Sequence, residues 1–435
     1  MDNGIKSIYE KLKECNFAVS TDTRQIIQSS LFFALPGPRF DGNDFARQAL
    51  AAGASYCVVT DPDLILQDER MLLVNDSLLT LQQLAAYHRH LMRAKVVAIT
   101  GSNGKTTTKE LLYSIMSRVR PTVATLGNLN NHIGLPLTLL RISEETEFAI
   151  VEMGANHMGE IAGLCTIASP DIGLITSIGK AHLEGFGNFE SVILAKKELF
   201  DYLDDHNAYS FYNLEQATLR QLYSQSAKHI PLGTEFPIGR YRVVVNEFHD
   251  KIILELISLE GVIVRINSKL YGLHNVENII NSAGLAHFLG ASVNQIAEGI
   301  SEYVPMNQRS QIINYRGNKI YMDAYNANPS SMEIALENFR QMVHPKKWLI
   351  LGSMAELGKY STEEHKKVLE MALECNPETI ILVGSGYDAI KETPQHVVKC
   401  SDVGEAKDWL DRYLHEGACI LIKGSRSNAL EKLID

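Results

Sequence analysis

Short apolar runs alternate with stretches of helical periodicity over much of the chain. Beyond residue 95 the sequence reads VVAIT before KTTTKELLYSIM, FAIVEMG before MGEIAGLCTIA, and IGLITSIG before FESVILAKKELFDYL. The alternation restarts beyond Pro305 with KIYMDAY, KWLILGS, TIILVG and ACILIKG. Apolar strands separated by helices are typical of parallel sheets covered on both faces, so the pattern predicts an α/β protein.

Two segments differ from this alternation. Near the N-terminus, LFFALPG and ASYCVVTD are apolar runs between turn signals and predict a small α/β domain. Between residues 240 and 272 the period falls to two, which predicts an antiparallel patch appended to a mostly parallel central sheet. A chain of 435 residues exceeds one typical core. We therefore expect three domains, at 1–90, 91–305 and 306–435.

Composition excludes several classes of protein. Hydrophobic residues make up 45% of the chain, and no apolar run is long enough to span a membrane. The start, MDNGIKSIYEKLKECNF, lacks a signal-peptide pattern, so we expect a cytoplasmic protein. Six widely spaced cysteines argue against zinc knuckles and disulfides and predict buried thiols. A net charge of −10 without a basic run argues against a nucleic-acid partner.

The turn between VVAIT and KTTTKELLYSIM is the strongest candidate for chemistry. Its backbone amides and the following helix N-terminus favour an anion. Lys105 would reach the β- and γ-phosphates of a nucleotide, and the Thr106 hydroxyl would ligate Mg²⁺. The usual P-loop has an outer glycine where this chain has Ile99, and the alternative is an ordinary glycine turn with a solvated lysine. The predicted phosphate-binding set is Gly101, Ser102, Asn103, Gly104, Lys105, Thr106 and Thr107.

Three residues near neighbouring strand ends are candidates for a metal site. Glu152 ends an apolar strand, where it would bind a metal or cap the next helix. His182 follows the next strand and is either a ligand or a structural histidine. Lys196 lies on the helix after it, and a magnesium ion would repel its ammonium. Lys196 therefore pairs with a phosphate, has lost its charge, or is a surface lysine beside Lys197.

Two polar segments suit a sugar or an amide-rich substrate. LGNLNNHIGLPLTLL holds three asparagines within four positions, and amides both donate and accept hydrogen bonds. The alternative is a polar loop that caps the LPLTLL helix. In YMDAYNANPSSMEIAL, Asp323 ends a strand and would accept from a ribose hydroxyl, although NPSS would equally serve as a helix N-cap.

Together these blocks resemble a known family. AITGSNGKTTTKELL, GNLNNHIGLPLTLL, VEMGANHMGEI, GKAHLEGFG, LHNVENIINSAGLA, MDAYNANPSSM and KGSR are similar to the Mur ligases of bacterial cell-wall synthesis. The resemblance extends from TDTRQI to KGSRSNALEKL, nearly the whole chain. It implies an N-terminal domain for a UDP group, a central P-loop-type ATPase domain, and a Rossmann-like C-terminal domain that closes over ATP.

YNANP and GLPLTLL resemble the branch of this family that joins D-alanyl-D-alanine to UDP-N-acetylmuramoyl-tripeptide. The resemblance implies that ATP phosphorylates the peptide carboxylate, and that the dipeptide amine attacks the acyl phosphate to give the pentapeptide. One alternative is the related ligase that adds a diamino acid one step earlier, but its YAH-type and DNPR-like motifs are missing here. Another is an inactive ATP-binding module, although the candidate phosphate and metal residues are all present. We expect a monomer.

The resemblance also implies roles for single residues. Lys105 matches a phosphate-binding residue, Thr106 and Glu152 match magnesium ligands, and His182 matches a ligand of a second Mg²⁺. Lys196 matches a lysine that is carbamylated, which turns a repelled cation into an anionic oxygen ligand. The implied catalytic residues are Lys105, His182 and Lys196. The implied ATP contacts are His274 and Asn278 near the adenine, Arg309 at the phosphates and Asp323 at the ribose. The implied substrate contacts are Thr23, Arg24, Asp41, Asn43, Asn131 and Asn326.

Two positions depart from the family pattern. Gln308 stands where a glycine usually precedes the arginine, and Ser353 in LGSMAELG stands where an aspartate is common. The first departure leaves Arg309 in place. The second puts in doubt a C-terminal contact that bears on the incoming amine or the closed state. No motif indicates which diamino acid occupies the third position of the peptide.

Overall fold

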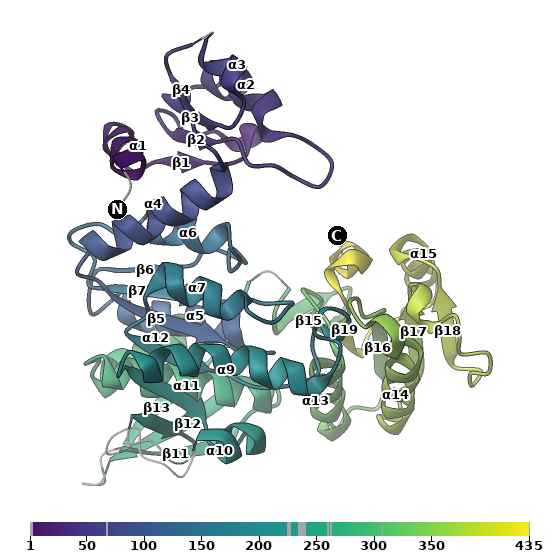
Figure 1. Ribbon diagram of the computed structural model, residues 1–435. Coiled ribbons are helices and arrows are strands. Elements are labelled where there is room, and N and C mark those ends of the chain that lie inside the picture. Colours follow the sequence, from purple (N-terminus) through teal and green to yellow (C-terminus); the bar gives the residue numbers. More distant parts are fainter. Residues whose placement is uncertain are drawn as a thin grey trace.

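The computed structural model describes residues 3–66, 68–223, 228–233, 241–258, 261, 263–306 and 308–434. Figure 1 shows three lobes in chain order, with the N-terminal lobe above the central lobe and the C-terminal lobe beside it. Each lobe contains a sheet with helices packed on it. This arrangement confirms the three-part α/β prediction. The domain limits at residues 90 and 305 stay a prediction.

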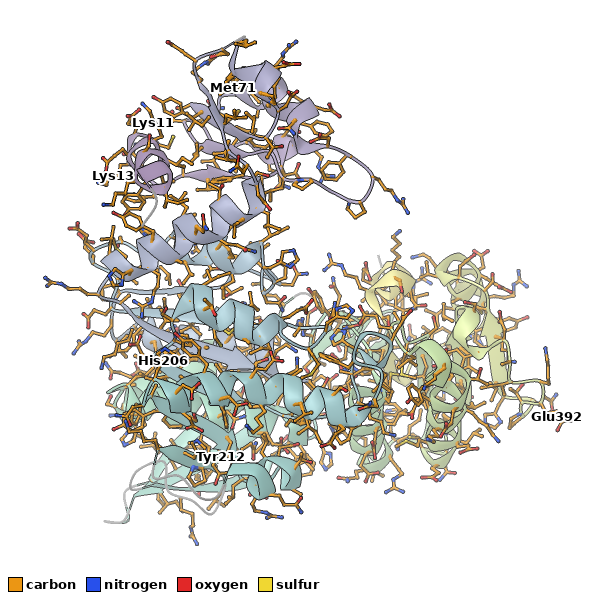
Figure 2. The ribbon with its side chains drawn as sticks, in the orientation of Figure 1. Lys11, Lys13, Met71, His206, Tyr212 and Glu392 are labelled. Atoms are coloured by element: carbon orange, nitrogen blue, oxygen red, sulfur yellow. The ribbon has the colours of Figure 1, made fainter. Side chains whose placement is uncertain are left out.

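The N-terminal lobe is built on a parallel sheet in the order β1-β2-β3-β4. On its first helix, Lys13 is exposed and pairs with Glu10 (Figure 2), whereas Lys11 pairs with Glu14 and donates to Tyr56 Oη of β3 at 3.3 Å. Leu84 of the last helix is fully buried, and this helix leads into the central lobe. The elements are α1 (Asn3–Glu14), β1 (Val19–Ser20), η1 (Thr23–Gln25), β2 (Leu31–Phe33), η2 (Gly42–Phe45), α2 (Ala46–Ala51), β3 (Tyr56–Val59), α3 (Pro62–Ile65), β4 (Met71–Leu73) and α4 (Ser77–Leu91).

The central lobe contains a six-stranded parallel sheet in the order β10-β9-β8-β5-β7-β6. Val96 and Ala98 of β5 join one buried core, whereas Val97 and Ile99 join a second core, because successive strand residues point to opposite faces. Both faces are therefore covered, as predicted. The strands are β5 (Lys95–Thr100), β6 (Thr122–Ala124), β7 (Phe148–Glu152), β8 (Ile172–Ile175), β9 (Tyr209–Asn213) and β10 (His229–Leu232). The helices are α5 (Lys105–Met116), α6 (Gly134–Leu139), α7 (Glu160–Ala168), α8 (Leu183–Phe186), α9 (Phe189–Asp205), α10 (Ala217–Tyr223), α11 (Leu273–Phe288) and α12 (Val293–Glu302).

The predicted antiparallel patch is present as β11 (Tyr241–Glu247), β12 (Ile252–Ser258) and β13 (Ile263–Ser268). These strands form a sheet of their own and do not extend the six-stranded sheet. Leu254 and Ile266 belong to the buried core that also contains Leu111 of α5. Side-chain packing, and not strand pairing, therefore attaches the patch.

The C-terminal lobe has a mixed sheet in the order β14-β15-β19-β16-β17-β18, in which only β14 is antiparallel to its neighbour. The strands are β14 (Gln311–Tyr315), β15 (Asn318–Asp323), β16 (Lys347–Gly352), β17 (Thr379–Val383), β18 (Val397–Cys400) and β19 (Cys419–Lys423). The helices are α13 (Pro329–Gln341), η3 (Gly358–Tyr360), α14 (Ser361–Glu374), η4 (Ser385–Tyr387), α15 (Val403–Tyr413), η5 (Arg426–Asn428) and η6 (Leu430–Leu433).

Two expectations from composition can be checked directly. All six cysteines are buried free thiols, as predicted. Within the described ranges, no helix combines the length and the apolar character that crossing a membrane requires.

Candidate active site

A cleft of about 940 Å³ opens at the carboxyl ends of β5 and β7 and is lined by the central lobe, the C-terminal lobe and helix α4. Open parallel sheets collect their ligands at this edge, because the loops that follow the strands converge there. Both lobes contribute side chains to its walls. The lining includes Ser102, Asn103, Gly104, Lys105, Thr106, Thr107, Asn131, Glu152, His182, His274, Asn278, Arg309, Asp323 and Asn326, all of them predicted, together with Asn130, Tyr325 and Lys423.

The turn after β5 requires glycine at two positions. Gly101 has φ +145° and Gly104 has φ +82°, in a region that side chains disfavour. A Cβ at Gly101 would lie 2.2 Å from Thr176 Oγ1, and a Cβ at Gly104 would lie 2.3 Å from Asn278 Oδ1. The spacing of these two glycines therefore suits the close approach of β8 and α11 to the turn.

Lys105 is held inside this turn. Its ammonium donates to Gly101 O at 2.7 Å and to Ser102 O at 3.1 Å. Burial lowers the pKa of Lys105, and the nearby Glu152 carboxylate partly opposes this effect. The alternative of a solvated lysine in an ordinary turn is therefore wrong. The ammonium lies where an anion bound by the turn amides would meet it.

Glu152 ends β7 with its carboxylate almost fully buried. Its Oε1 accepts hydrogen bonds from Asn130 Nδ2 at 2.7 Å and from Thr106 Oγ1 at 3.2 Å. Its Oε2 makes no hydrogen bond with the described part of the chain. The alternative of a helix cap is wrong, because Gly159 N and Ala162 N at the start of α7 donate to the carboxylate of Glu198 and not to Glu152. One carboxylate oxygen is thus fixed by hydrogen bonds, whereas the other makes none and lies 3.9 Å from the Lys109 ammonium.

Lys196 lies on α9 with 2% of its surface exposed, so the surface-lysine alternative is wrong. Its Nζ is 3.5 Å from Ala155 O and 5.4 Å from the centre of the Phe186 ring. Burial, followed by the charge of Lys105, lowers the pKa of Lys196 to about 7. A substantial fraction of the amine is therefore neutral and nucleophilic near neutral pH.

His182 precedes α8 and contacts the C-terminal lobe. Its φ is +52°, and its Nδ1 forms a close ion pair with the carboxylate of Glu356, which lies in the turn after β16. The hydrogen bond from His182 lowers the pKa of Glu356, although burial opposes this effect. The histidine side chain is thus held at the boundary between two lobes.

Asp323 ends β15 and is paired with a buried lysine. Lys423 Nζ lies 2.5 Å from Asp323 Oδ2, and the two residues are register partners on adjacent parallel strands. Burial raises the pKa of Asp323, but the charge of Lys423 and the hydrogen bond that it donates lower this pKa overall. The carboxylate stays ionised and able to accept hydrogen bonds in the cleft.

His274 and Arg309 form the part of the wall next to Asp323. Burial lowers the pKa of His274 to about 4, and its Nε2 lies 3.3 Å from Ser310 Oγ. The Arg309 guanidinium lies 3.7 Å from the centre of the Tyr325 ring. Gln308 has φ +52°, so the glycine usual there matches the backbone conformation.

Asn278 connects α11 to α5. Its Oδ1 accepts from Thr108 Oγ1 at 3.2 Å, and its Nδ2 donates to Asn275 Oδ1 at 2.9 Å. Since the same Oδ1 limits the space at Gly104, this side chain fixes the distance between α11 and the phosphate turn.

Comparison with known proteins identifies the family. Residues 18–96 match the catalytic domain of the Mur ligase family, residues 99–286 the Mur ligase middle domain, and residues 308–426 the Mur ligase glutamate ligase domain. The UDP-N-acetylmuramoyl-tripeptide--D-alanyl-D-alanine ligase of Escherichia coli K12 is 34% identical over 425 residues, which cover 96% of this chain and 92% of that protein. The chain belongs to the Mur ligase family.

Solved structures give the same assignment. MurF from Acinetobacter baumannii superposes with a TM-score of 0.84 at 31% identity, over 96% of this chain and 92% of that one. MurF from Thermotoga maritima, solved in complex with ADP, superposes with a TM-score of 0.82 at 26% identity, over 100% and 97% of the two chains. This Mur ligase is therefore an ATP-dependent amide ligase of peptidoglycan precursor synthesis, as the sequence resemblance implied.

Some predicted residues of the Mur ligase lie apart from the cleft lining. Lys196 and Gly101 are buried and do not line the cleft. Four residues belong to the N-terminal lobe, where they make local contacts: Thr23 lies in η1, Arg24 pairs with Asp22, Asp41 caps η2, and Asn43 donates to Thr60. Their contact with a UDP group stays a prediction.

The asparagine segment both caps a helix and lines the cleft, so the two interpretations of its sequence apply together. Asn131 Oδ1 caps α6 by accepting from Gly134 N at 2.9 Å, and Asn131 also lines the cleft. Asn328 caps α13 in the same way, whereas Asn326 lines the cleft. Among the residues that the structure describes, no group of three or more His, Cys, Asp or Glu side chains is arranged to hold a metal.

Four site residues of the Mur ligase were missed by the sequence analysis. Asn130 binds Glu152, Lys109 lies beneath it, Glu356 contacts His182, and Lys423 pairs with Asp323. Asn130, Lys109 and Glu356 lie in motifs that contain another candidate residue, and Lys423 begins the KGSR motif. The sequence does not indicate which side chain each of these residues contacts, because that depends on strand order and on how the lobes meet.

Proposed function

We propose that this Mur ligase joins D-alanyl-D-alanine to UDP-N-acetylmuramoyl-tripeptide and forms UDP-N-acetylmuramoyl-pentapeptide. The observation that carries the proposal is the match, over nearly the full length of both chains, to ligases of that name. The diamino-acid ligase is disfavoured by its missing motifs. We also propose that residues 1–90 bind the UDP group, that 91–305 bind ATP, and that 306–435 close the site.

The reaction has two steps, phosphorylation of the peptide carboxylate and attack by the dipeptide amine. A terminal carboxylate oxygen of the peptide attacks the γ-phosphorus of ATP, the bond to the β-phosphate oxygen breaks, and ADP leaves. The neutral amine of the dipeptide then attacks the acyl carbon, phosphate leaves with the bonding electron pair, and the nitrogen loses one proton. Activation is needed because a free carboxylate is a poor electrophile, whereas an acyl phosphate has a good leaving group.

The phosphate turn supplies the chemistry that ATP needs. The amides at residues 101–107 and the α5 N-terminus would hold the phosphates, and Lys105 would offset charge on the β- and γ-phosphates. Arg309 would add a second cation from the C-terminal lobe. Asp323 would accept from the ribose hydroxyls, while His274 and Asn278 lie on the side proposed for the adenine.

Residues of the cleft fit magnesium. The free Oε2 of Glu152 and the Thr106 hydroxyl are the hard oxygen donors that Mg²⁺ prefers, and a buried carboxylate oxygen without a hydrogen bond suits a cation. We propose that these two residues and His182 hold two Mg²⁺ ions, which when bound would offset the charge of the reacting phosphate and carboxylate.

Lys196 fits carbamylation. Its buried amine, with a pKa of about 7, would attack CO₂ to form a nitrogen–carbon bond and release one proton. The product is an anionic oxygen donor, so it removes the repulsion between a lysine and Mg²⁺. Within the peptide site, Asn131 and Asn326 would contact the UDP-linked substrate, while Thr23, Arg24, Asp41 and Asn43 would contact its nucleotide end.

The test is release of phosphate from ATP with defined substrates. We expect release only when Mg²⁺, UDP-N-acetylmuramoyl-tripeptide and D-alanyl-D-alanine are all present, with pentapeptide formed in equal amount. Lys105→Ala provides the inactive control. Turnover with UDP-dipeptide and a diamino acid would instead identify the related ligase, and nucleotide binding without any turnover would identify an inactive module. Tripeptides with different third residues would then define the substrate.

A further inference from the structure

A contact between His182 and Glu356 crosses the boundary between the central and C-terminal lobes. The Glu356 carboxylate pairs with His182 Nδ1, and its backbone oxygen accepts from Glu184 N at 3.0 Å. His182 has φ +52° and Glu356 has φ +61°, although neither is glycine. Such conformations persist where the surrounding contacts fix them, and they gather at functional sites.

We propose that Glu356 is a positioning residue that orients the imidazole of His182 for metal binding. A histidine that binds a metal through one nitrogen usually donates its other N–H to a carboxylate, which fixes the tautomer and the ring orientation. The inference rests on the metal-binding role of His182 in the proposed function. Through Glu356, the C-terminal lobe would thus help to complete the proposed metal site of the central lobe.

The chemistry of the ring supports this role. His182 Nδ1 faces the Glu356 carboxylate, and a proton placed on Nδ1 leaves the lone pair on Nε2, which is the form that binds a cation. Nε2 makes no hydrogen bond with the residues that the structure describes, and His182 lines the cleft. The ring is therefore fixed on one side and available on the other.

Other contacts hold the same two lobes together without touching His182. Lys180 Nζ pairs with Glu364 at 3.2 Å, and Lys180 N donates to Ser330 Oγ at 2.8 Å. Asn328 Nδ2 donates to Asn103 Oδ1 at 2.9 Å. Because docking has these independent supports, the contribution of Glu356 can be separated from docking itself. The Lys180–Glu364 ion pair provides the matched control.

The experiment measures Mn²⁺ affinity by electron paramagnetic resonance, using the full-length protein with ADP. Glu356→Asn tolerates a positive φ but cannot reach His182, whereas Glu356→Gln keeps the length and an acceptor oxygen. We expect Mn²⁺ to bind about tenfold more weakly to Glu356→Asn, with a smaller loss in Glu356→Gln. Glu364→Gln should bind Mn²⁺ within about twofold of the wild type, because its contact does not include the ring.

A second readout is the tautomer of His182, followed by ¹⁵N NMR of protein labelled in its histidine rings. The wild type and Glu364→Gln should carry the proton on Nδ1, whereas Glu356→Asn should show a mixture. If His182→Ala weakens Mn²⁺ binding and Glu356→Asn does not, the positioning role is wrong and the proposed function stands. If His182→Ala leaves Mn²⁺ affinity unchanged, the metal role fails and this inference fails with it. If Glu364→Gln and Glu356→Asn lose Mn²⁺ affinity equally, Glu356 only helps to dock the two lobes, and the proposal is overturned.

Discussion

The Lys109 ammonium lies 3.9 Å from Glu152 Oε2, and both side chains are almost fully buried. Lys109 Nζ also donates to Thr125 O at 2.7 Å and to Gly127 O at 3.1 Å, which places the cation beneath the asparagine segment. A buried charge is costly unless an opposite charge or hydrogen bonds compensate it. Lys109 therefore offsets the cost of keeping an ionised carboxylate at the proposed metal site.

Lys109→Met tests this relationship, since it removes the charge at similar volume. We expect the free energy of unfolding to fall by about 3 kcal/mol, because the substitution removes a buried cation beside Glu152 and Glu110 and leaves two carbonyls without a donor. Urea unfolding measures this loss. Lys197→Met, which removes a surface pair with Asp201, should change stability by at most about 0.5 kcal/mol. Similar losses in the two variants would contradict the role of Lys109.

Gly104→Ala tests the geometry of the phosphate turn. The added Cβ would meet Asn278 Oδ1 at 2.3 Å and would have φ +82°. We expect weaker ADP binding by calorimetry and a loss of about 2 kcal/mol in stability, since both strain and overlap act at this position. Gly159→Ala is the matched control, because Gly159 also precedes a helix with φ +83° but has no heavy atom within 4 Å of the added Cβ. If both variants bind ADP equally well, the close approach of Asn278 is unimportant.

The apolar pattern was sufficient to predict the fold because buried strands and helix faces are local properties of sequence. The same pattern also indicates that Lys196 is buried. On α9, Lys196 follows Val192 by four positions and precedes Leu199 by three, so it shares their buried face. Helical periodicity alone would have rejected a surface lysine.

Contacts between segments that are distant in the sequence could not be predicted from local patterns. The pair Asp323 and Lys423 exists because β15 and β19 are adjacent in register, and strand order does not follow from periodicity. The contact between His182 and Glu356 depends on how two lobes meet, which no local pattern encodes. The residues predicted for the UDP group make local hydrogen bonds in the N-terminal lobe and do not line the cleft, so their contact with that group stays a prediction.

Lys196→Ala tests the carbamate. We expect ligation to fall by about 100-fold or more, because an anionic oxygen ligand is lost, and we expect added formate or acetate to restore part of it. Chloride at the same ionic strength should not restore activity. Lys197→Ala serves as the control, because Lys197 is the half-buried neighbour of Lys196 and pairs with Asp201. This variant should retain activity and show no response to carboxylic acids. Full activity of Lys196→Ala without additives would refute the role.

His274 makes stability depend on pH. Burial lowers its pKa to about 4 from an ordinary value of 6.5, and Asp323 only partly opposes this effect. Below pH 6.5 the unfolded chain binds a proton that the folded chain takes up only near pH 4. Stability is therefore lost as pH falls from 6.5 to 4, by up to about 3 kcal/mol, and is fully present above pH 6.5.

Urea unfolding at pH 7.5, 6.5, 5.5 and 4.5 measures this dependence by comparing the wild type with His274→Gln. The glutamine cannot be protonated. As pH falls below 6.5, the free energy of unfolding of the wild type should therefore decrease relative to that of the variant, whatever the difference between the two proteins at pH 7.5. Subtracting the two curves removes the contributions of carboxylates that titrate in both proteins. His206→Gln is the control at an exposed histidine (Figure 2), and its curve should run parallel to that of the wild type. A parallel curve for His274→Gln would mean that the folded chain accepts the proton at its ordinary pKa, and that the histidine beside the proposed adenine site is not held neutral by burial.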